Sequence, residues 1–325
     1  MSYVQYKDKR FYIINNTLNL SGQQIESISN IVGLDRITDL QNLILGNNKI
    51  SKIEGLGHLT GLKQLDLGFN DIEDITGIDN LTQLEYLGLE ANKIAKIKGL
   101  GNLRFLRFLY LSGNRITEIE GLKHLPNLEI LNLSENGISE IKGLDNLVNL
   151  RELDLVHNKI NKIKGLDNLK ELRTLDLMEN VITKIEKLSH LKKLQDLTLT
   201  RNKITTIEPV FKLLSLDLLS LKNNPIQDKR YKYLAELTIN FPSFRYFSNL
   251  PFYKDLDFDN LLAEITKIRE ELETVEDAEL INIGTHLENS VLKEKQNFVF
   301  FNTRVTPETL AGKDTSKTGL IFHLI

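Results

Sequence analysis

Residues 40–61 read LQNLILGNNKISKIEGLGHLTG, and seven further units of the same length follow without insertion or deletion. All eight follow the template L-x-x-L-x-L-x-x-N-x-I-x-x-I-x-G-L-x-x-L-x-x. They begin at Leu40, Leu62, Leu84, Leu106, Leu128, Leu150, Leu172 and Leu194. A fixed period of this kind predicts a solenoid, in which each unit packs against its neighbours because one unit cannot bury its own apolar face.

The template assigns a structural role to each half of the unit. Its L-x-x-L-x-L half predicts a short strand with leucines facing the core and variable residues facing outward, since alternate side chains of a strand point to opposite faces. Its I-x-x-I-x-G-L-x-x-L half predicts a return path with a tight bend. We therefore expect an α/β fold of the leucine-rich repeat class. It would be a right-handed curved coil with a parallel sheet on the concave face and short helical turns on the convex face.

Two more columns of the template have backbone roles. The asparagines follow the strand, where a buried carboxamide can donate and accept hydrogen bonds to the turning backbone. The glycines suit a positive φ angle or a close backbone approach. Lys187 and Pro209 replace this glycine in the last two units, so we expect the bends there to differ in shape. The columns are Asn48, Asn70, Asn92, Asn114, Asn136, Asn158, Asn180 and Asn202, and Gly55, Gly77, Gly99, Gly121, Gly143 and Gly165.

The repeats divide the chain into four predicted parts. Residues 1–39 form an N-terminal cap and a degenerate first repeat, residues 40–215 the eight repeats, and residues 216–250 a terminal repeat with a C-terminal cap. Residues 251–325 form an acidic tail with 8 Lys+Arg against 14 Asp+Glu, whose pattern predicts helices followed by strands in a small α+β appendage. The alternating stretch 3–14 predicts a hairpin that covers the first repeat, with a helix as the competing interpretation.

The units and the end of the array together resemble a known family. Residues 224–226 (Asn-Pro-Ile) are followed by residues 241–244 (Phe-Pro-Ser-Phe). With the return path, this is similar to the leucine-rich proteins typified by protein phosphatase 1 regulatory subunit 7, over about residues 15–250. The resemblance implies a concave face that binds another protein, with a phosphatase catalytic subunit as one candidate. That family uses a tryptophan near its last repeats, whereas this chain has none and carries Thr198 and Thr200 there.

Composition excludes several other classes of protein. The chain has no cysteine, which excludes a disulfide framework and cysteine metal ligands. No apolar run reaches the length of a membrane span, and the N-terminus is polar and charged through Arg10, unlike a signal peptide. The net charge is −3 and no basic stripe follows one face. We therefore expect an intracellular, cytoplasmic protein, with a nuclear location still open, that binds no nucleic acid, no membrane and no cofactor.

The variable strand positions form two neighbouring candidate patches on the sheet. Exposed aromatic area marks interaction sites, and clustered carboxylates steer basic partners. A tail folded over the aromatic patch is the competing structural interpretation. Metal binding or acid–base catalysis at the carboxylates is disfavoured, because an open sheet provides no desolvated pocket. The aromatic patch is Phe69, Tyr86, Phe108, Tyr110 and Ile130, and the acidic patch is Glu152, Asp154, Asp176 and Asp196.

These features predict a non-enzymatic scaffold or regulatory subunit that captures a protein partner with a basic or apolar surface. We expect a monomer rather than a dimer, with no catalytic, cofactor or metal site. One alternative is an adaptor whose C-terminal appendage dimerises or carries an activity of its own. Another is an adhesin of the bacterial internalin type, which shares the 22-residue period. Such an adhesin is expected to carry a signal peptide and a wall anchor or membrane segment.

Overall fold

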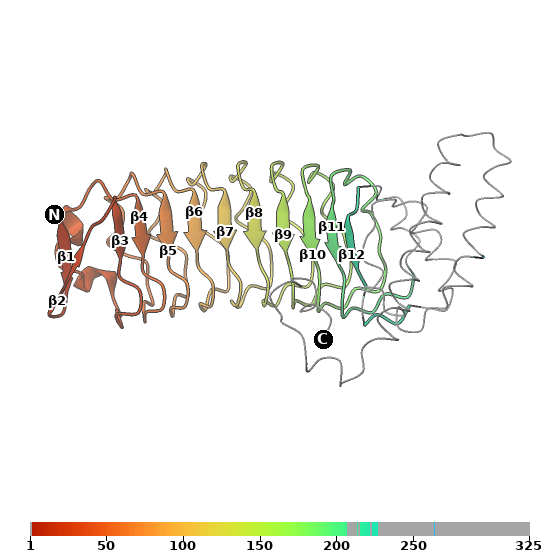
Figure 1. Ribbon diagram of the computed structural model, residues 1–325, viewed down its shortest axis with the longest axis horizontal. Helices are drawn as coiled ribbons and strands as arrows, with labels where there is room; N and C mark the ends of the chain where they lie inside the picture. The colour runs from red at the N-terminus through yellow and green to blue at the C-terminus, as the bar shows by residue number, and fades with distance from the viewer. Residues whose placement is uncertain (1, 207–212, 214, 222, 227–262, 264–325) are drawn as a thin grey trace, which may run out of the picture. The chain divides into compact units, whose positions relative to one another are not determined.

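The computed structural model describes residues 2–206, 213, 215–221, 223–226 and 263. All of these except Ala263 belong to the first of the chain's two compact units, Met1–Asp228 with Ser243–Lys254. In this unit a ten-stranded parallel sheet follows the order of the chain from β3 to β12 (Figure 1). Each repeat contributes one strand, which confirms the predicted solenoid. The strands are β3 (Thr17–Asn19), β4 (Asn42–Ile44), β5 (Gln64–Asp66), β6 (Tyr86–Gly88), β7 (Phe108–Tyr110), β8 (Ile130–Asn132), β9 (Glu152–Asp154), β10 (Thr174–Asp176), β11 (Asp196–Thr198) and β12 (Leu218–Ser220).

The register of the sheet keeps the repeats in phase. From β4 onward each strand residue pairs with the residue 22 positions further along, as Leu43 does with Leu65. Leu18 of β3 pairs with Leu43 at a separation of 25, because three extra residues precede Leu40. These four leucines have no exposed surface. Burial of one such side chain contributes about 2 kcal/mol, so the stacked leucine columns form the stabilising core.

The asparagine column is hydrogen-bonded as the sequence predicts. The Asn70 Nδ2 atom donates to the carbonyl groups of Leu67 at 3.0 Å and Gly68 at 3.2 Å in its own unit. It also donates to the carbonyl group of Leu45 in the preceding unit at 3.0 Å, and Asn70 Oδ1 accepts from the Ile50 N–H at 2.9 Å. One carboxamide therefore satisfies backbone groups of two adjacent units.

The return paths contain turns where short helical turns were predicted. In the first, degenerate unit the path forms two 3₁₀ helices, η1 (Ile28–Asn30) and η2 (Leu34–Arg36). From residue 40 to residue 206 it forms no helix. Instead the N–H of Leu59 donates to the carbonyl of Leu56, and the N–H of Leu62 to the carbonyl of Leu59. The expectation of helical turns in every repeat was wrong, because the short G-L-x-x-L segment closes two successive turns and then enters the next strand.

The glycine column marks close backbone contacts, as predicted. Gly99 has a φ angle of 78°, and a Cβ atom added there would lie 2.0 Å from the carbonyl oxygen of Ile75. Lys187, which replaces the glycine in a later unit, has a φ angle of 55°. We expected the bend at Lys187 to differ in shape from the glycine bends. Its φ angle does not differ in sign, since Lys187 keeps the left-handed conformation. Pro209 lies outside the described residues.

The N-terminal stretch is a hairpin, so the competing helix interpretation was wrong. Strand β1 (Tyr3–Tyr6) pairs antiparallel with β2 (Lys9–Tyr12). The backbone groups of Gln5 and Val32 exchange hydrogen bonds of 2.9 and 2.8 Å, and Tyr6 is buried. The hairpin thus packs against the return path of the degenerate first unit, which is the covering role predicted for it.

Two further predictions concern parts of the chain beyond the repeats. The predicted cap helix, acidic tail and α+β appendage fall in residues 227–325, which lie outside the described residues except for Ala263. Within the described part of the chain, no helix combines the length and the apolar character that a membrane crossing requires.

Candidate binding face

The third and fifth residues of each unit project from the side of the ten-stranded sheet opposite the leucine core, which we call the open face. The leucine between them is buried in every strand from β3 to β12. Backbone pairing aligns the projecting residues in two rows across the sheet. One row is Asn42, Gln64, Tyr86, Phe108, Ile130, Glu152, Thr174, Asp196 and Leu218. The other row is Ile44, Asp66, Gly88, Tyr110, Asn132, Asp154, Asp176, Thr198 and Ser220.

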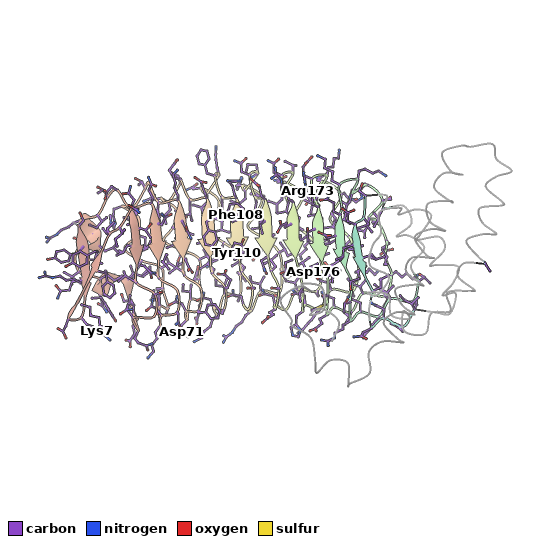
Figure 2. The ribbon with its side chains drawn as sticks, in the orientation of Figure 1. Lys7, Asp71, Phe108, Tyr110, Arg173 and Asp176 are labelled. Carbon is purple, nitrogen blue, oxygen red and sulfur yellow. The ribbon has the colours of Figure 1, made fainter. Side chains whose placement is uncertain are left out.

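The structure places the predicted aromatic residues on β6 to β8 and the predicted acidic residues on β9 to β11. Figure 2 shows Phe108 and Tyr110 on β7 and Asp176 further along the sheet on β10. The two patches adjoin where Ile130 pairs with Glu152. Phe69 differs from the others, because it lies in the loop after β5 with 66% of its surface exposed. The candidate residues therefore form one continuous surface with Phe69 at its edge.

The aromatic patch consists of two separate contacts. The rings of Tyr86 and Tyr110 are tilted against each other, with centroids 5.4 Å apart and an angle of 39° between their planes. The ring of Phe108 instead faces the guanidinium of Arg107, at 5.0 Å from its centroid. Such an arrangement is a cation–π contact. Phe108 therefore packs against Arg107, the residue just before β7, while the two tyrosines form a pair on the face.

Two carboxylates that the sequence patterns did not single out lie beside this tyrosine pair. A Cβ atom added to Gly68 would lie 3.1 Å from Glu90 Oε2 and 3.4 Å from Asp66 Oδ1. A Cβ atom added to Gly88 would lie 3.0 Å from Glu90 Oε2 and 3.2 Å from the Tyr86 hydroxyl oxygen. The polar groups thus occupy space that the glycines leave free. The tyrosine–carboxylate cluster, as we call it, consists of Asp66, Tyr86, Glu90 and Tyr110.

The repeat register contains the signal that identifies Glu90. It is the seventh residue of its unit, directly after the strand leucine. The corresponding residues of the other units are uncharged, so a carboxylate at this position is an exception that needs a reason. They are Gly46, Gly68, Ser112, Ser134, Val156, Met178 and Thr200.

The tyrosine–carboxylate cluster is partly desolvated and negatively charged. Burial, together with Glu90 and Asp66, raises the pKa of Tyr86 to about 12. Burial also raises the pKa of Tyr110 and that of Glu90. Desolvation disfavours the charged form of each group, and the neighbouring carboxylates add to it. Within the described residues, no Lys, Arg or His forms an ion pair with Asp66 or Glu90.

The carboxylates of the acidic patch have a structural role as well as a surface role. Asp154 accepts hydrogen bonds from the Val156 N–H at 3.0 Å and from Asn132 Nδ2 at 2.9 Å. Asp176 accepts from the Met178 N–H at 3.0 Å. Aspartate and asparagine make such bonds to the backbone two residues on where a chain turns. Aspartate at the fifth position therefore also helps to end the strand.

The same carboxylates titrate abnormally. Burial raises the pKa of Asp176 to about 6, and the adjacent charge of Asp154 adds to the effect. Burial raises the pKa of Asp154 too, with a smaller contribution from Glu135. Glu152 is exposed, and Asp196 Oδ2 lies 3.5 Å from the Thr174 hydroxyl. The acidic patch therefore combines three half-buried aspartates with the more accessible Glu152.

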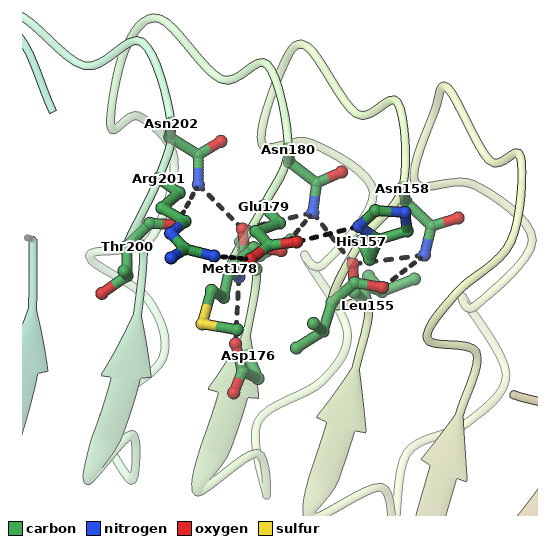
Figure 3. A network of polar contacts seen from close by, with 12 residues as sticks. Leu155, His157, Asn158, Asp176, Met178, Glu179, Asn180, Thr200, Arg201 and Asn202 are labelled. Atoms are coloured by element: carbon green, nitrogen blue, oxygen red, sulfur yellow. Dashed lines mark hydrogen bonds and ion pairs between the residues drawn. The ribbon is translucent and has the colours of Figure 1, made fainter. Parts of the chain in front are cut away.

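Several charged residues that flank the strands, in contrast, form ion pairs. Glu179 lies between His157, whose Nδ1 is 2.9 Å away, and Arg201 (Figure 3). These hydrogen bonds lower the pKa of Glu179. At the other end of the strands Glu129 binds Arg107 at 2.7 Å and Arg151 at 3.1 Å, and the Arg107 bond lowers its pKa.

The face does not resemble a metal centre. In the described part of the chain, no three His, Cys, Asp or Glu side chains group in a way that could hold a metal ion. The carboxylates of the acidic patch are instead spread over three strands: Asp154 and Asp176 pair with each other in one row, and Glu152 and Asp196 lie on either side of Thr174 in the other row. This geometry suits a long contact surface.

The repeat pattern matches two family models. A model described as leucine-rich repeat region matches residues 69–285, more than half of the chain, and one described as leucine-rich repeats (2 copies) matches residues 38–80. The chain belongs to the leucine-rich repeat family. This fold is typical of protein-binding scaffolds. No curated protein matches this leucine-rich repeat protein.

Several solved structures share the solenoid. An internalin (inlF) of Listeria monocytogenes is 26% identical with a TM-score of 0.53, and the match covers 70% of this chain and 78% of that one. Internalin C2 of the same organism is 31% identical with a TM-score of 0.53, covering 57% and 80%. TLR13, solved in complex with ssRNA13, is 31% identical with a TM-score of 0.51, covering 59% of this chain and 30% of that one.

Proposed function

We propose that this leucine-rich repeat protein is a non-enzymatic scaffold that captures a protein partner on the open face of its sheet. One observation carries the proposal: half-exposed aromatic rings adjoin a row of carboxylates that have no ion-pair partner among the described residues. Aromatic side chains supply anchoring area in protein interfaces. Unpaired carboxylates steer a partner of opposite charge.

The charge of the face favours a protein over a nucleic acid. Asp66, Glu90, Glu152, Asp154 and Asp176 would repel phosphate groups, whereas nucleic-acid affinity depends on neutralising them with Lys and Arg. The likeness to TLR13 is therefore one of fold. A phosphatase catalytic subunit is the partner that the resemblance to the regulatory-subunit family supplies, and we propose it as a candidate on that ground alone.

The test compares capture of partners by the face with capture by another exposed aromatic residue. The intact chain and the double variant Phe108→Ala/Tyr110→Ala serve as affinity baits, with Phe105→Ala as the control. Phe105 is 53% exposed and belongs to the return path between β6 and β7, outside the two rows of the open face. We expect the double variant to lose the partner that the other two baits retain, with unchanged circular dichroism because the core leucines are intact. Retention of the partner by the double variant would contradict the proposal.

A further inference from the structure

We propose that the tyrosine–carboxylate cluster is a subsite that holds one arginine side chain of the protein partner. This inference rests on the proposed function, because it assigns a specific chemistry to part of the same face. The cluster combines two carboxylates, two phenol rings and a floor of glycines, and it lies on β5 to β7.

The glycines make room for the carboxylate groups of the subsite. Asp66 Oδ1 and Oδ2 lie 3.3 Å from the point that a Gly46 Cβ would occupy, and Glu90 Oε2 lies within 3.1 Å of the equivalent points above Gly68 and Gly88. Three successive repeat units thus lack a Cβ atom next to these carboxylate oxygens. Because the cluster lies on the open face, opposite the leucine core, a side chain of a partner can approach these oxygens without displacing a core residue.

The charge of the cluster matches a guanidinium. Glu90 and Asp66 supply acceptors without a cation of their own among the described residues. Tyr86 and Tyr110 stay neutral at physiological pH, and their rings pack on each other with centroids 5.4 Å apart, so that the pair presents aromatic surface on the open face. A guanidinium is planar, donates five hydrogen bonds and stacks on aromatic rings, while an ammonium does only part of this.

The chain already holds one of its own arginines in this way. The Arg107 guanidinium lies 5.0 Å from the ring centroid of Phe108 and donates to Glu129 at 2.7 Å. An aromatic ring beside a carboxylate therefore binds arginine at the edge of this sheet. The tyrosine–carboxylate cluster repeats the combination on the face, with the cation absent among the described residues.

The chain's own tail is a poor occupant for this subsite. Residues 251–325 contain 8 Lys+Arg and 14 Asp+Glu, a net charge of −6. Such a segment is repelled on average by a face that carries unpaired carboxylates. Charge complementarity therefore favours a separate, basic partner.

The test uses nuclear magnetic resonance of the intact chain with labelled tyrosine rings, assigned by Tyr→Phe variants. The probe is the capped peptide Gly-Ser-Gly-Arg-Gly-Ser-Gly, and its control carries uncharged citrulline in place of arginine. We expect the Tyr86 and Tyr110 signals to shift saturably with the arginine peptide only. A lysine version should bind more weakly. Equal shifts with citrulline, or none with arginine, would overturn the proposal.

Matched variants separate a local subsite from the general negative field. Glu90→Gln should weaken binding of the arginine peptide roughly 10-fold, because it removes a charge-assisted hydrogen bond. Glu73→Gln removes the same charge from an exposed position on the return path and should cost about 2-fold or less. Gly88→Ala should also weaken binding, since its Cβ would lie 3.0 Å from Glu90 Oε2, while Gly61→Ala, with nothing within 4 Å, should not. Equal effects of the two charge variants would mean that the peptide responds only to the general negative potential of the chain, and would overturn the local subsite.

The outcome is separable from that of the proposed function. If Phe108→Ala/Tyr110→Ala abolishes capture of the partner and Glu90→Gln leaves both capture and peptide binding intact, the face binds a protein and the arginine subsite is wrong. If the arginine peptide binds as expected while the double variant still captures the partner, the subsite stands and the capture surface lies elsewhere.

Discussion

Charged side chains follow the same 22-residue repeat on the open face and at the two ends of the strands, which we call the edges of the sheet. The two sets differ in their surroundings. At the second position of five successive units the charges alternate in sign, from Lys63 to Arg151. Glu129 binds two arginines, and Glu179 binds His157 and Arg201. On the face, Asp154 and Asp176 lie in register with each other, and no cation in the described residues pairs with either.

The pKa values record this difference. Glu129 and Glu179 have a lowered pKa because of hydrogen bonds to their partners, while Glu90, Asp154 and Asp176 have a raised pKa because of burial. Edge charges are satisfied by neighbouring units and so support the solenoid. The raised pKa values mean that the charged form of these face carboxylates is disfavoured in the folded chain, a cost that a basic partner of the kind proposed would offset.

The largest expected effect concerns a third polar region, the buried asparagine column, where the fold satisfies every group itself. Asn92 donates to the carbonyls of Leu67, Leu89 and Glu90 and accepts from the Ile72 N–H. Asn92→Ala should cost about 3 kcal/mol in the free energy of unfolding, because buried backbone groups lose their partners. Urea unfolding followed by circular dichroism measures it.

An exposed asparagine provides the control for that experiment. Asn102 is exposed, and its side chain makes one hydrogen bond, to the Asp79 carbonyl at 3.2 Å. Asn102→Ala should change the free energy of unfolding by less than about 0.5 kcal/mol. Similar costs for the two variants would show that burial of the column is not what makes it stabilising.

The next prediction compares a carboxylate of the face with one of the edge. Neutralising the two should change the free energy of unfolding by a medium amount and in opposite directions. Asp176→Asn should stabilise the chain by about 1 kcal/mol at pH 7, because the half-buried charge disappears while the amide oxygen can still accept from the Met178 N–H. Glu129→Gln should destabilise it by less than about 1 kcal/mol, since both arginine contacts weaken. The same sign for both variants would remove the distinction between face and edge.

The pH dependence of the Asp176→Asn gain provides a direct check. The folded pKa of Asp176 is raised from 3.8 to about 6, so the folded chain binds the proton more tightly than the unfolded chain. Stability attributable to this residue therefore falls as the pH rises through that window. The advantage of Asp176→Asn should be full above it and absent below it. A gain that stays constant from roughly pH 3.5 to pH 7.5, which are the limits of the titration, would contradict the raised pKa of Asp176.

The smallest effect concerns Phe69 at the edge of the aromatic patch. Its φ angle is 57°, a conformation that bulky residues rarely adopt, and Asn47 and Asn223 occupy the same position in other units with φ of 56° and 60°. Phe69→Asn should raise the free energy of unfolding by roughly 0.5 kcal/mol and weaken capture of the partner. Thermal unfolding and the affinity bait measure the two effects. A loss of stability would mean that the ring packs within the chain.

The repeat sequence predicted much of this structure because its positions are restricted one by one. The buried leucines, the bonds of Asn70, the close approach at Gly99 and the strands of the N-terminal hairpin all follow from local pattern. The helical turns did not follow, because the G-L-x-x-L spacing fits two successive turns as well as a helix. The separation of Phe108 from the tyrosine pair depends on side-chain rotation toward Arg107, which spacing does not specify.

The sequence by itself determined which residues face inward and which row of the open face each variable residue occupies, because strand side chains alternate and the repeat has a constant length. Only the tertiary structure decided that Glu90 and Asp66 lean over Gly68 beside Tyr86. It also decided that the carboxylates of the face remain unpaired within the described residues while Glu129 does not. The physical reason is that side-chain rotation and neighbour distance depend on the space each unit leaves for the next.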